Sequence, residues 1–389
     1  MEISLEKPIQ QEVSVTNTGD LSEIQRVLTE LLYVPDDKLK LVVVLELLDY
    51  FKEKFSQKDY KINFFYTKQN GNITGFVVSQ IDKEYRSYGM KCPTFGWLTS
   101  KDFLSCKLLM GECEDFVRKH KFRKIRGPIN FPKISGGIGY QTEGFEAPML
   151  NGVAFNEPSS KVLEYLQELG YKKDAKYSCV EVVESNWNKG NNLDDDIVLK
   201  FLHPHEIREL RSQILTLAQN SFYSVLADAP GGQSRFEEMM DSYDLVFGNR
   251  FVIKDNFDPR SISSIPEFIE AWESCDLNKI VPCCPLAYDR TNGELVGIIM
   301  ALPNLFQLWS KEPLTHLNVD TVIINKEYAG RGIFSSLQNV GQITSRLHGF
   351  EYVEGTTIYA NNDRAISTIF PHSTPLRTHY VVQKRILRK

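Results

Sequence analysis

A turn containing two glycines joins an apolar run to an amphipathic segment near the end of this 389-residue chain. Residues 321–324 are all β-branched, residues 327–334 read Glu-Tyr-Ala-Gly-Arg-Gly-Ile-Phe, and residues 335–348 have helical spacing. Gly330 and Gly332 allow the backbone to approach a ligand closely, and a helix N-terminus favours anions. The stretch is therefore predicted to bind a phosphate group, with the alternative that the two glycines only form a tight turn.

The arrangement differs from both common phosphate loops. A P-loop requires Lys and then Ser or Thr after its second glycine, and a dinucleotide loop requires a third glycine. This chain has Ile333, Phe334 and Ser335 at those positions. The stretch instead resembles motif A of the GNAT acyltransferase superfamily, Gln/Arg-x-x-Gly-x-Gly/Ala, which binds the pyrophosphate of coenzyme A. Glu327 stands where Gln or Arg is usual.

This resemblance implies which residues would hold coenzyme A or an acyl-CoA co-substrate. Main-chain groups of one strand would pair with the pantetheine arm, and these belong to Val322, Ile323 and Ile324. Main-chain N–H groups of the turn and of the first helical turn would form the pyrophosphate cradle, at Ala329, Gly330, Arg331, Gly332, Ile333 and Phe334. The Arg331 side chain would add a charge-assisted contact. No metal is implied.

The resemblance extends to other parts of the chain. Residues 362–365, Asn-Asp-Arg-Ala, are similar to GNAT motif B, in which Asn-x-x-Ala opens a short helix beside the pantetheine arm. Asn362 is a suitable N-cap for such a helix. In the N-terminal half, residues 126–131 read Arg-Gly-Pro-Ile-Asn-Phe and residues 143–148 read Glu-Gly-Phe-Glu-Ala-Pro. Their order resembles a poorly characterised bacterial family of roughly this length, built from two tandem GNAT-like domains.

The family's chemistry, if it applies here, is direct transfer of an acyl group from a coenzyme A thioester to an amine. A base must take a proton from the attacking ammonium, and Asp320 and Glu354 are the carboxylates near the expected cofactor strands. The acid that reprotonates the thiolate is often a tyrosine in the motif B helix, where this chain has Phe370. Tyr359 and Tyr380 are the possible replacements.

Two classes of function remain open at this point. The first is an acyl-CoA-dependent N-acyltransferase with a small-molecule or peptide amine as acceptor, and an O-acyltransferase is a lesser variant of it. The second is a non-catalytic GNAT-fold protein that binds coenzyme A or retains only the fold. The intact glycine turn and Asn362 favour the first class, whereas Glu327 and the missing motif B tyrosine favour the second.

Composition narrows the range of partners. With 42% hydrophobic and 24% charged residues the chain is typical of a globular protein, and its net charge of −5 argues against nucleic acid as a partner. No apolar run is long enough for a membrane span, and the first residues do not resemble a secretory signal, so a cytoplasmic location is expected. The seven scattered cysteines fit reduced thiols, and His203 and His205 lack further metal ligands nearby in the sequence.

The chain is predicted to be an α/β (α+β) protein with two tandem GNAT-like domains, each a mixed, mostly antiparallel sheet flanked by helices. A polar stretch at residues 184–196 is the predicted linker between an N-terminal domain, residues 1–183, and a C-terminal cofactor domain, residues 197–389. Each half offers helices, then a hairpin with an Asn-Gly turn, then a strand, a loop and a helix.

Local patterns predict the elements that must position the site. Helices are expected at residues 21–32, 38–55, 103–120, 160–169, 205–221, 236–244 and 335–348, the first with Asp20 as its N-cap. Strands are expected at residues 62–67, 73–80, 125–127, 178–183, 285–290, 295–302, 318–324 and 353–359. By the resemblance, the last two would be parallel strands that splay apart around the cofactor. The glycines of residues 136–139 predict either a substrate-side loop or a second anion site.

Overall fold

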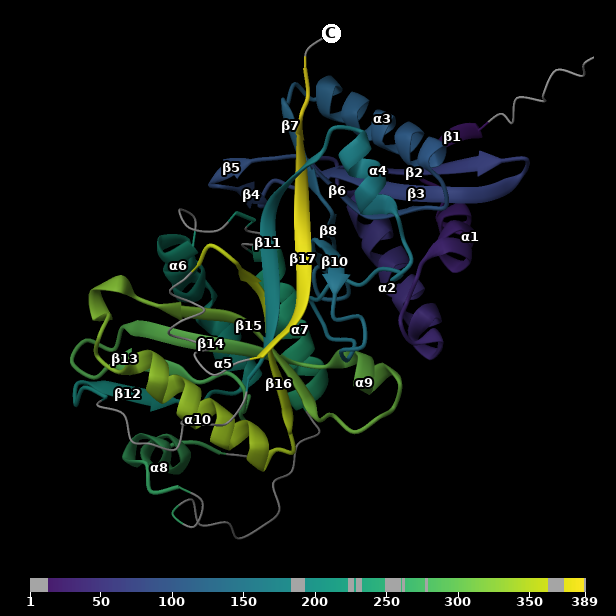
Figure 1. Ribbon diagram of the computed structural model, residues 1–389. Coiled ribbons are helices and arrows are strands. Elements are labelled where there is room, and N and C mark those ends of the chain that lie inside the picture. The colour runs from purple at the N-terminus through teal and green to yellow at the C-terminus, as the bar shows by residue number, and fades with distance from the viewer. Residues whose placement is uncertain are drawn as a thin grey trace, which may run out of the picture.

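The computed structural model shows two groups of helices and strands joined by long central strands (Figure 1). It describes residues 13–182, 193–222, 227–228, 233–248, 260, 263–276, 279–362 and 374–387. Most of the predicted linker lies outside these ranges, so the domain boundaries at residues 183 and 197 stay a prediction.

The N-terminal half opens with an edge strand, two helices and a long hairpin, β1 (Val13–Thr18), α1 (Leu21–Leu31), α2 (Asp37–Ser56), β2 (Lys61–Gln69) and β3 (Asn72–Ile81). A two-residue hairpin and a strand–helix–strand unit follow, β4 (Arg86–Ser87), β5 (Met90–Lys91), β6 (Thr94–Ser100), α3 (Phe103–Lys119) and β7 (Lys124–Gly127). The half ends with β8 (Ile129–Asn130), β9 (Gly137–Ile138), β10 (Tyr140–Glu143), α4 (Val162–Glu168) and β11 (Lys172–Glu181).

The C-terminal half has a similar order. It opens with β12 (Ile197–Lys200), α5 (Pro204–Glu209), α6 (Arg211–Phe222), α7 (Gln233–Phe247) and α8 (Pro266–Glu273). A hairpin, a short helix and a long strand follow, β13 (Leu286–Asp289), β14 (Leu295–Pro303), α9 (Leu305–Trp309) and β15 (His316–Ile324). The last elements are the short 3-10 helix η2 (Lys326–Tyr328), α10 (Ile333–Leu347), β16 (Tyr352–Tyr359) and β17 (Thr374–Arg385).

One continuous sheet crosses both halves because each half contributes its last strand to the other. The described strands follow the order β1-β2-β3-β6-β7-β17-β11-β16-β15-β14-β13-β12. β17, from the end of the chain, pairs with β7, whereas β11 pairs with β16 of the C-terminal half. In Figure 1 the yellow β17 runs beside the teal β11 through the centre of the molecule. Completing either half therefore requires the other.

The two long hairpins confirm the predicted repeat. Asn70 and Gly71 turn the chain between β2 and β3, and Gly293 lies in the turn between β13 and β14. The second strand of each hairpin has a glycine that packs against a later helix of the same half, α3 or α10. A Cβ at Gly75 would lie 3.0 Å from Leu109 of α3, and a Cβ at Gly297 would lie 3.0 Å from Ile333 of α10. These glycines let each helix pack closely on its sheet.

Separate apolar cores fill the space on the two faces of the sheet. In the N-terminal half, α1 and α2 cover one face and α3 and α4 the other, with Phe64 and Phe76 in the first core and Phe95 in the second. In the C-terminal half, α5 to α7 cover one face around Tyr243, and α8 and α10 cover the opposite face. None of the described helices is long and apolar enough to span a membrane.

Two predicted elements differ from the structure. The helix expected at residues 205–221 is divided into α5 and α6 at Leu210, whose N–H donates to the carbonyl groups of Glu206 and Ile207. The strand expected at residues 178–183 begins earlier, because β11 is Lys172–Glu181. Its extra residues pair with β17, a partner that the local pattern could not reveal.

Candidate functional site

The site is formed around two parallel strands that separate. β15 and β16 are paired from His316 opposite Tyr352 to Val319 opposite Gly355, and the pairing then ends. Beyond that point β15 keeps its pairing with β14, and β16 keeps its pairing with β11. Residues 320–324 of β15 therefore present one edge of main-chain N–H and C=O groups that no strand of the described residues occupies.

A β-bulge lies where the strands separate. Thr321 is opposite Met300 and Val319 is opposite Ala301, so Asp320 is the extra residue of β15. Bulges bend a strand and redirect a side chain. The Asp320 carboxylate accordingly points to the face covered by α7 and by loops of the N-terminal half, where it meets Lys133 and Arg235.

β15 passes into α10 through an open turn. Residues 325–332 separate the two elements, and Gly330 and Gly332 have φ values of +84° and +74°. Gly332 is the N-cap of α10 and has no side chain to cap the first N–H groups of this helix. A Cβ at Gly330 would have no atom of the described residues within 4 Å apart from its chain neighbours, so this part of the turn is open to an approaching ligand. Glu327 is exposed, and its N–H is held by the Asn325 side chain.

All nine residues predicted in motif A lie together along this strand, turn and helix. Val322 and Phe334 are half-buried and line an apolar groove of about 50 Å³ between α10 and the sheet. Ile323 and Ile333 point into cores, at 1% and 2% exposure, so only their main chains could contact a cofactor. The structure thus allows the main-chain contacts that the resemblance implied.

Side chains around the turn hold it in place. The Tyr328 hydroxyl donates to Asp289 at 2.8 Å, and the Arg331 guanidinium lies 5.1 Å from the Tyr328 ring centroid. Hydrogen bonds from the Thr291 hydroxyl and from Tyr328 lower the pKa of Asp289 to about 2. Arg331 donates from Nε to Asp194 at 2.8 Å. The predicted phosphate contact of Arg331 therefore competes with a carboxylate in the free protein.

The second predicted cofactor motif is described only at its start. The Asn362 N–H donates to the Tyr359 carbonyl at 2.9 Å, which turns the chain directly after β16. The other residues of the motif, 363–365, and Phe370 lie outside the described residues. The structure thus places Asn362 beside the splayed end of β16, and its role as a helix N-cap stays a prediction.

Glu354, a predicted base, is buried within an ion pair. It is 0% exposed, and both of its carboxylate oxygens accept from Arg377 at 2.9 Å. The Tyr352 hydroxyl donates to the same carboxylate at 2.8 Å. A carboxylate held by a guanidinium in this way stabilises the junction of β16 and β17, and this placement favours a structural role.

The two predicted tyrosines lie in different surroundings. The Tyr359 hydroxyl, at the end of β16, is 3.4 Å from that of Tyr88 and 3.1 Å from the Asn361 amide. Tyr380 lies on β17, and β11 separates it from β16. The Lys173 ammonium is 4.0 Å from its ring centroid. Tyr359 is thus close to the splayed strands, whereas Tyr380 is not.

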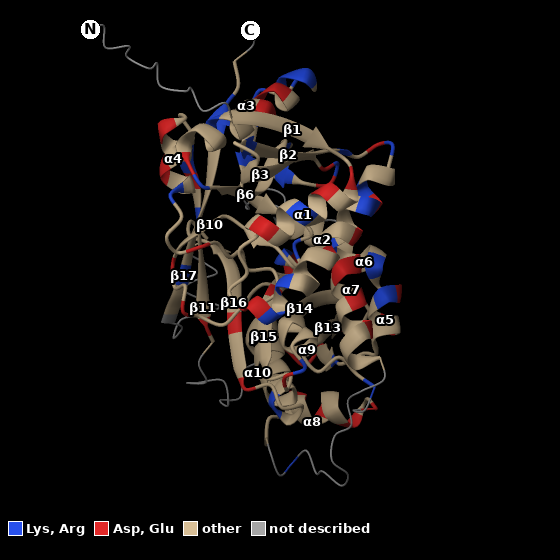
Figure 2. Ribbon diagram, turned by 90° about the vertical axis from the view of Figure 1, so that its right-hand side faces the viewer, with Lys and Arg blue, Asp and Glu red and all other residues tan. Residues whose placement is uncertain are grey.

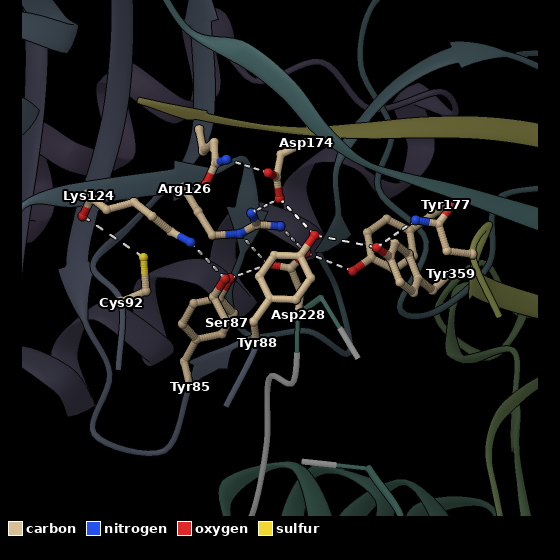
Figure 3. A network of polar contacts seen from close by, with 12 residues as sticks. Tyr85, Ser87, Tyr88, Cys92, Lys124, Arg126, Asp174, Tyr177, Asp228 and Tyr359 are labelled. Atoms are coloured by element: carbon tan, nitrogen blue, oxygen red, sulfur yellow. Dashed lines mark hydrogen bonds and ion pairs between the residues drawn. The ribbon is translucent and has the colours of Figure 1, made fainter. Parts of the chain in front are cut away.

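Tyr359 also joins a polar network between the two halves (Figure 3). Arg126 of β7 is 0% exposed and donates from Nε and Nη2 to Asp228 at 2.9 and 2.7 Å. Tyr177 donates to Asp228 at 2.7 Å, and Tyr88 donates to Asp174 at 3.0 Å. Asp174 also binds Arg126. The Arg-Gly-Pro landmark thus carries a buried cation that binds the C-terminal half, a role that local sequence could not show.

A second buried cluster joins the halves at the bulge. Lys133 Nζ and Arg235 Nη2 contact one oxygen of Asp320 at 2.9 and 2.6 Å, and Arg235 Nη1 contacts Glu238 at 2.8 Å. Burial alone would raise the pKa of Asp320, but the charges of Arg235 and Lys133 outweigh it and hold this pKa well below its usual range. Burial lowers the pKa of Lys133. Asp320, the other predicted base, is therefore fully engaged in the free protein.

The glycine loop of residues 136–139 presents Lys133 to this cluster and does not form a second anion site. A Cβ at Gly136 would lie 2.2 Å from the Asn130 carbonyl oxygen, and a Cβ at Gly137 would lie 2.2 Å from the Ala154 nitrogen. The glycines are needed because backbone packs directly against them. Both are buried, which excludes the alternative of an anion cradle at these two residues.

Comparison with known proteins identifies the fold. No protein-family model and no curated protein matches the chain. A solved structure of a tandem GNAT protein from the clavulanic acid biosynthesis pathway matches with a TM-score of 0.55 and 9% identity, over 97% of this chain and 100% of that chain. The chain has a tandem GNAT fold. The resemblance found in the sequence is thus confirmed at the level of the fold.

A second solved structure supports the same assignment. It is a conserved protein of unknown function from Enterococcus faecalis V583, described as a probable N-acyltransferase. The two proteins match with a TM-score of 0.50 and 10% identity, over 97% of this chain and 73% of the other.

Proposed function

We propose that this protein is an acyl-CoA-dependent N-acyltransferase that transfers an acetyl or longer acyl group directly to an amine. The observation that carries the proposal is the open turn into α10, where Gly332 leaves the first helical N–H groups without a side-chain cap, beside the unpaired edge of β15. Phosphate groups bind at such helix ends because N–H donors and the helix dipole act together.

The proposed cofactor position follows from these two features. Main-chain N–H groups from Ala329 to Phe334 would bind the pyrophosphate, and the free edge at Val322 to Ile324 would pair with the pantetheine amides. The thioester would then lie near Val319, where the pairing of β15 and β16 ends. N–H donors fixed at that point would stabilise the oxyanion that forms as the amine attacks.

Among the predicted acid and base residues, we propose Tyr359 as the acid. Its hydroxyl contacts Tyr88 and Asn361, and none of the described cations binds it, whereas Glu354 is bound to Arg377. Tyr359 would donate its proton to the departing thiolate and recover one through Tyr88, which is 44% exposed. The proton of the ammonium would leave through water.

A non-catalytic coenzyme A-binding protein is the second candidate, and three ion pairs favour it. The candidate bases Asp320 and Glu354 both form buried ion pairs, and the Arg331 side chain is held by Asp194. In this alternative the cradle binds the cofactor, but neither of these two carboxylates is free to accept a proton.

Release of free thiol from acetyl- and palmitoyl-coenzyme A, measured with a panel of amines, separates the two candidates. The wild-type protein is expected to release thiol only when an amine is present, and Gly332→Asp is expected to abolish the release. Gly349→Asp is the matched control, because Gly349 also has a positive φ, +87°, but follows the opposite end of α10. Thioester binding without any amine-dependent release would leave the binding protein as the answer.

A further inference from the structure

The apolar groove between α10 and the sheet continues past the point where β15 and β16 separate. Of the 15 described residues that line it, none is charged. α10 itself carries a single charged residue, Arg346, whereas Figure 2 shows charged residues along α7, which covers the opposite face of the sheet. The side chains of the groove therefore offer no charge to a phosphate or an ammonium group, and they suit an aliphatic chain.

The two ends of the groove lie at different places relative to the separating strands. At one end Phe334 and Val322 adjoin the glycine turn and the free edge of β15. At the other end Leu317 is opposite Val353, in the part where β15 and β16 are still paired. The residues of α10 that line the groove run from Phe334 to Ser345, which corresponds to about 16 Å along the helix.

The proposed cofactor position leaves the far part of this groove unused. The pantetheine arm would follow the main-chain edge of β15, and its thioester would lie near Val319. Val319 lines the groove between its two ends. The side chains of Val319 and Val353 are only half-buried in the free protein, so apolar surface is available beyond the thioester. An acyl group attached there would enter the groove directly.

We propose that this groove binds the acyl chain of the donor, and that the transferred acyl group is a straight chain of about four to six carbons. The inference rests on the proposed transferase function and adds to it the class of acyl donor. The volume of the groove, about 50 Å³, sets the length. A water-sized group needs about 10–15 Å³ on this measure, and a methylene group is of similar size, so roughly three to five carbons fit beyond the thioester carbonyl.

The walls of the groove support a chain of limited length. Gly341 lies in the middle of α10 and faces the groove, although glycine is unfavourable inside a helix. A Cβ at Gly341 would lie 3.0 Å from Cγ of Pro285, which also lines the groove. At the far end the Ser345 hydroxyl donates to the Pro282 carbonyl at 3.4 Å and ties α10 to the loop before β13. The groove therefore has space in its middle and a fixed far end.

Calorimetric titration with coenzyme A and with its acetyl, butyryl, hexanoyl, octanoyl and decanoyl thioesters tests the chain length. From acetyl to hexanoyl the affinity is expected to rise by about fourfold per methylene group, because apolar surface leaves water. From hexanoyl to decanoyl it is expected to change by less than about twofold per methylene group, since the chain extends beyond the groove. The affinity for coenzyme A itself is the reference for each protein.

Two substitutions of Val353 change the far end of the groove in opposite directions. Val353→Phe is expected to fill it, so that hexanoyl- and acetyl-coenzyme A bind with equal affinity. Val353→Ala is expected to enlarge it, so that the affinity continues to rise to octanoyl. Val42→Phe and Val42→Ala, at a half-buried valine of α2, are the matched controls and should leave the chain-length preference unchanged. Circular dichroism confirms that each variant is folded.

The outcomes separate this inference from the proposed function. If coenzyme A binds and the affinity does not depend on chain length from acetyl to hexanoyl, the inference is overturned and the transferase stays. The same holds if the affinity of the wild type rises steadily to decanoyl, or if the folded Val353 variants both keep the wild-type preference. If neither coenzyme A nor any thioester binds, the proposed function fails, and the inference fails with it.

Discussion

Both halves of this protein contain a strand-to-helix turn, but the residue that caps the helix differs between them. In the N-terminal half only Lys101 and Asp102 separate β6 from α3, and the Asp102 carboxylate accepts the Ser105 N–H at 2.8 Å. In the C-terminal half residues 325–332 separate β15 from α10, and Gly332 is the N-cap. A carboxylate cap occupies the helix N–H groups and repels phosphate, whereas a glycine cap leaves them free. We call the turn before α3, with its capping carboxylate, the closed turn. The turn before α10, with its glycine cap, is the open turn.

The β-bulges beside these turns differ as well. Trp97 lies in the bulge of β6, where its φ is +52° and its indole N–H donates to the Phe131 carbonyl at 2.8 Å. Asp320 lies in the bulge of β15 and binds two cations. A groove of about 540 Å³ adjoins the closed turn. Space alone does not make it a coenzyme A site, because the anion cradle is missing there.

The largest expected effect is the loss of stability on substitution of Asp320, the charged residue in the bulge of β15. Asp320→Ala leaves Lys133 and Arg235 buried without their shared anion, and we expect it to lower the free energy of unfolding by roughly 3–5 kcal/mol. Trp97→Phe, at the bulge of the other half, removes one hydrogen bond and should cost only about 1 kcal/mol. Urea unfolding of both variants measures the difference. Equal losses would show that the two bulges are energetically alike.

The contribution of Asp320 should also depend on pH with a defined sign. Its pKa in the folded protein lies below the usual value, so its stabilising effect is present above the usual aspartate pKa of about 3.9. The effect is lost as the pH falls through the lowered pKa. The stability difference between wild type and Asp320→Ala should therefore be constant from about pH 6 to 8 and shrink in acid. A difference that grows in acid would contradict this assignment.

The next effect concerns the open turn. Gly332→Asp places a carboxylate at the cap of α10, which the closed turn has naturally at Asp102. Coenzyme A affinity should fall by about 100-fold, because one charged repulsion and several N–H contacts are affected together. Calorimetry measures the loss, and circular dichroism confirms that the variant is folded. An affinity within about threefold of the wild type would rule out this turn as the phosphate site.

A substitution at the closed turn should change the free energy of unfolding and leave coenzyme A binding unchanged. Asp102→Ala removes the N-cap of α3 and is expected to cost about 1 kcal/mol of unfolding free energy. It should not create a second coenzyme A site, since only two residues separate β6 from α3. Thermal unfolding and a coenzyme A titration of the same variant check both parts. A new binding event would show that the cap alone keeps this turn closed.

A smaller effect is expected at Asp194, which holds Arg331 in the free protein. Asp194→Asn removes a carboxylate near the cradle and frees the guanidinium, so coenzyme A should bind about threefold more tightly. The gain is small because the pair is solvent-exposed. Titration at low and at high salt should show that the gain shrinks as salt rises. Weaker binding would mean that Asp194 positions Arg331 for the phosphate.

Local patterns in the sequence were sufficient to predict most elements and the glycine turn before α10. These patterns involve only residues that are close in the sequence. Examples are the glycine spacing at residues 330–332, the Asp20 cap of α1 and the Asn-Gly hairpin turn. The contacts that the sequence could not reveal join distant segments. Lys133 and Asp320 are 187 residues apart, and Arg126 and Asp228 are 102 residues apart. The exchange of β11 and β17 likewise depends on tertiary packing.

The predicted catalytic residues show the same difference between local patterns and contacts with distant segments. The sequence predicts Glu354 as a base and Tyr380 as an acid, but their partners, Arg377 and Lys173, come from other strands. A carboxylate in a strand has the same local pattern whether it is free or paired. Distinguishing a base from a structural ion pair therefore requires the fold.

The central claim is that only one of the two turns binds coenzyme A, and the number of sites tests it most directly. Calorimetric titration of the wild-type protein with coenzyme A should show one site per chain, and this site should persist in Asp102→Ala and disappear in Gly332→Asp. Two sites per chain, or a single site that survives Gly332→Asp, would contradict the distinction between the open and the closed turn.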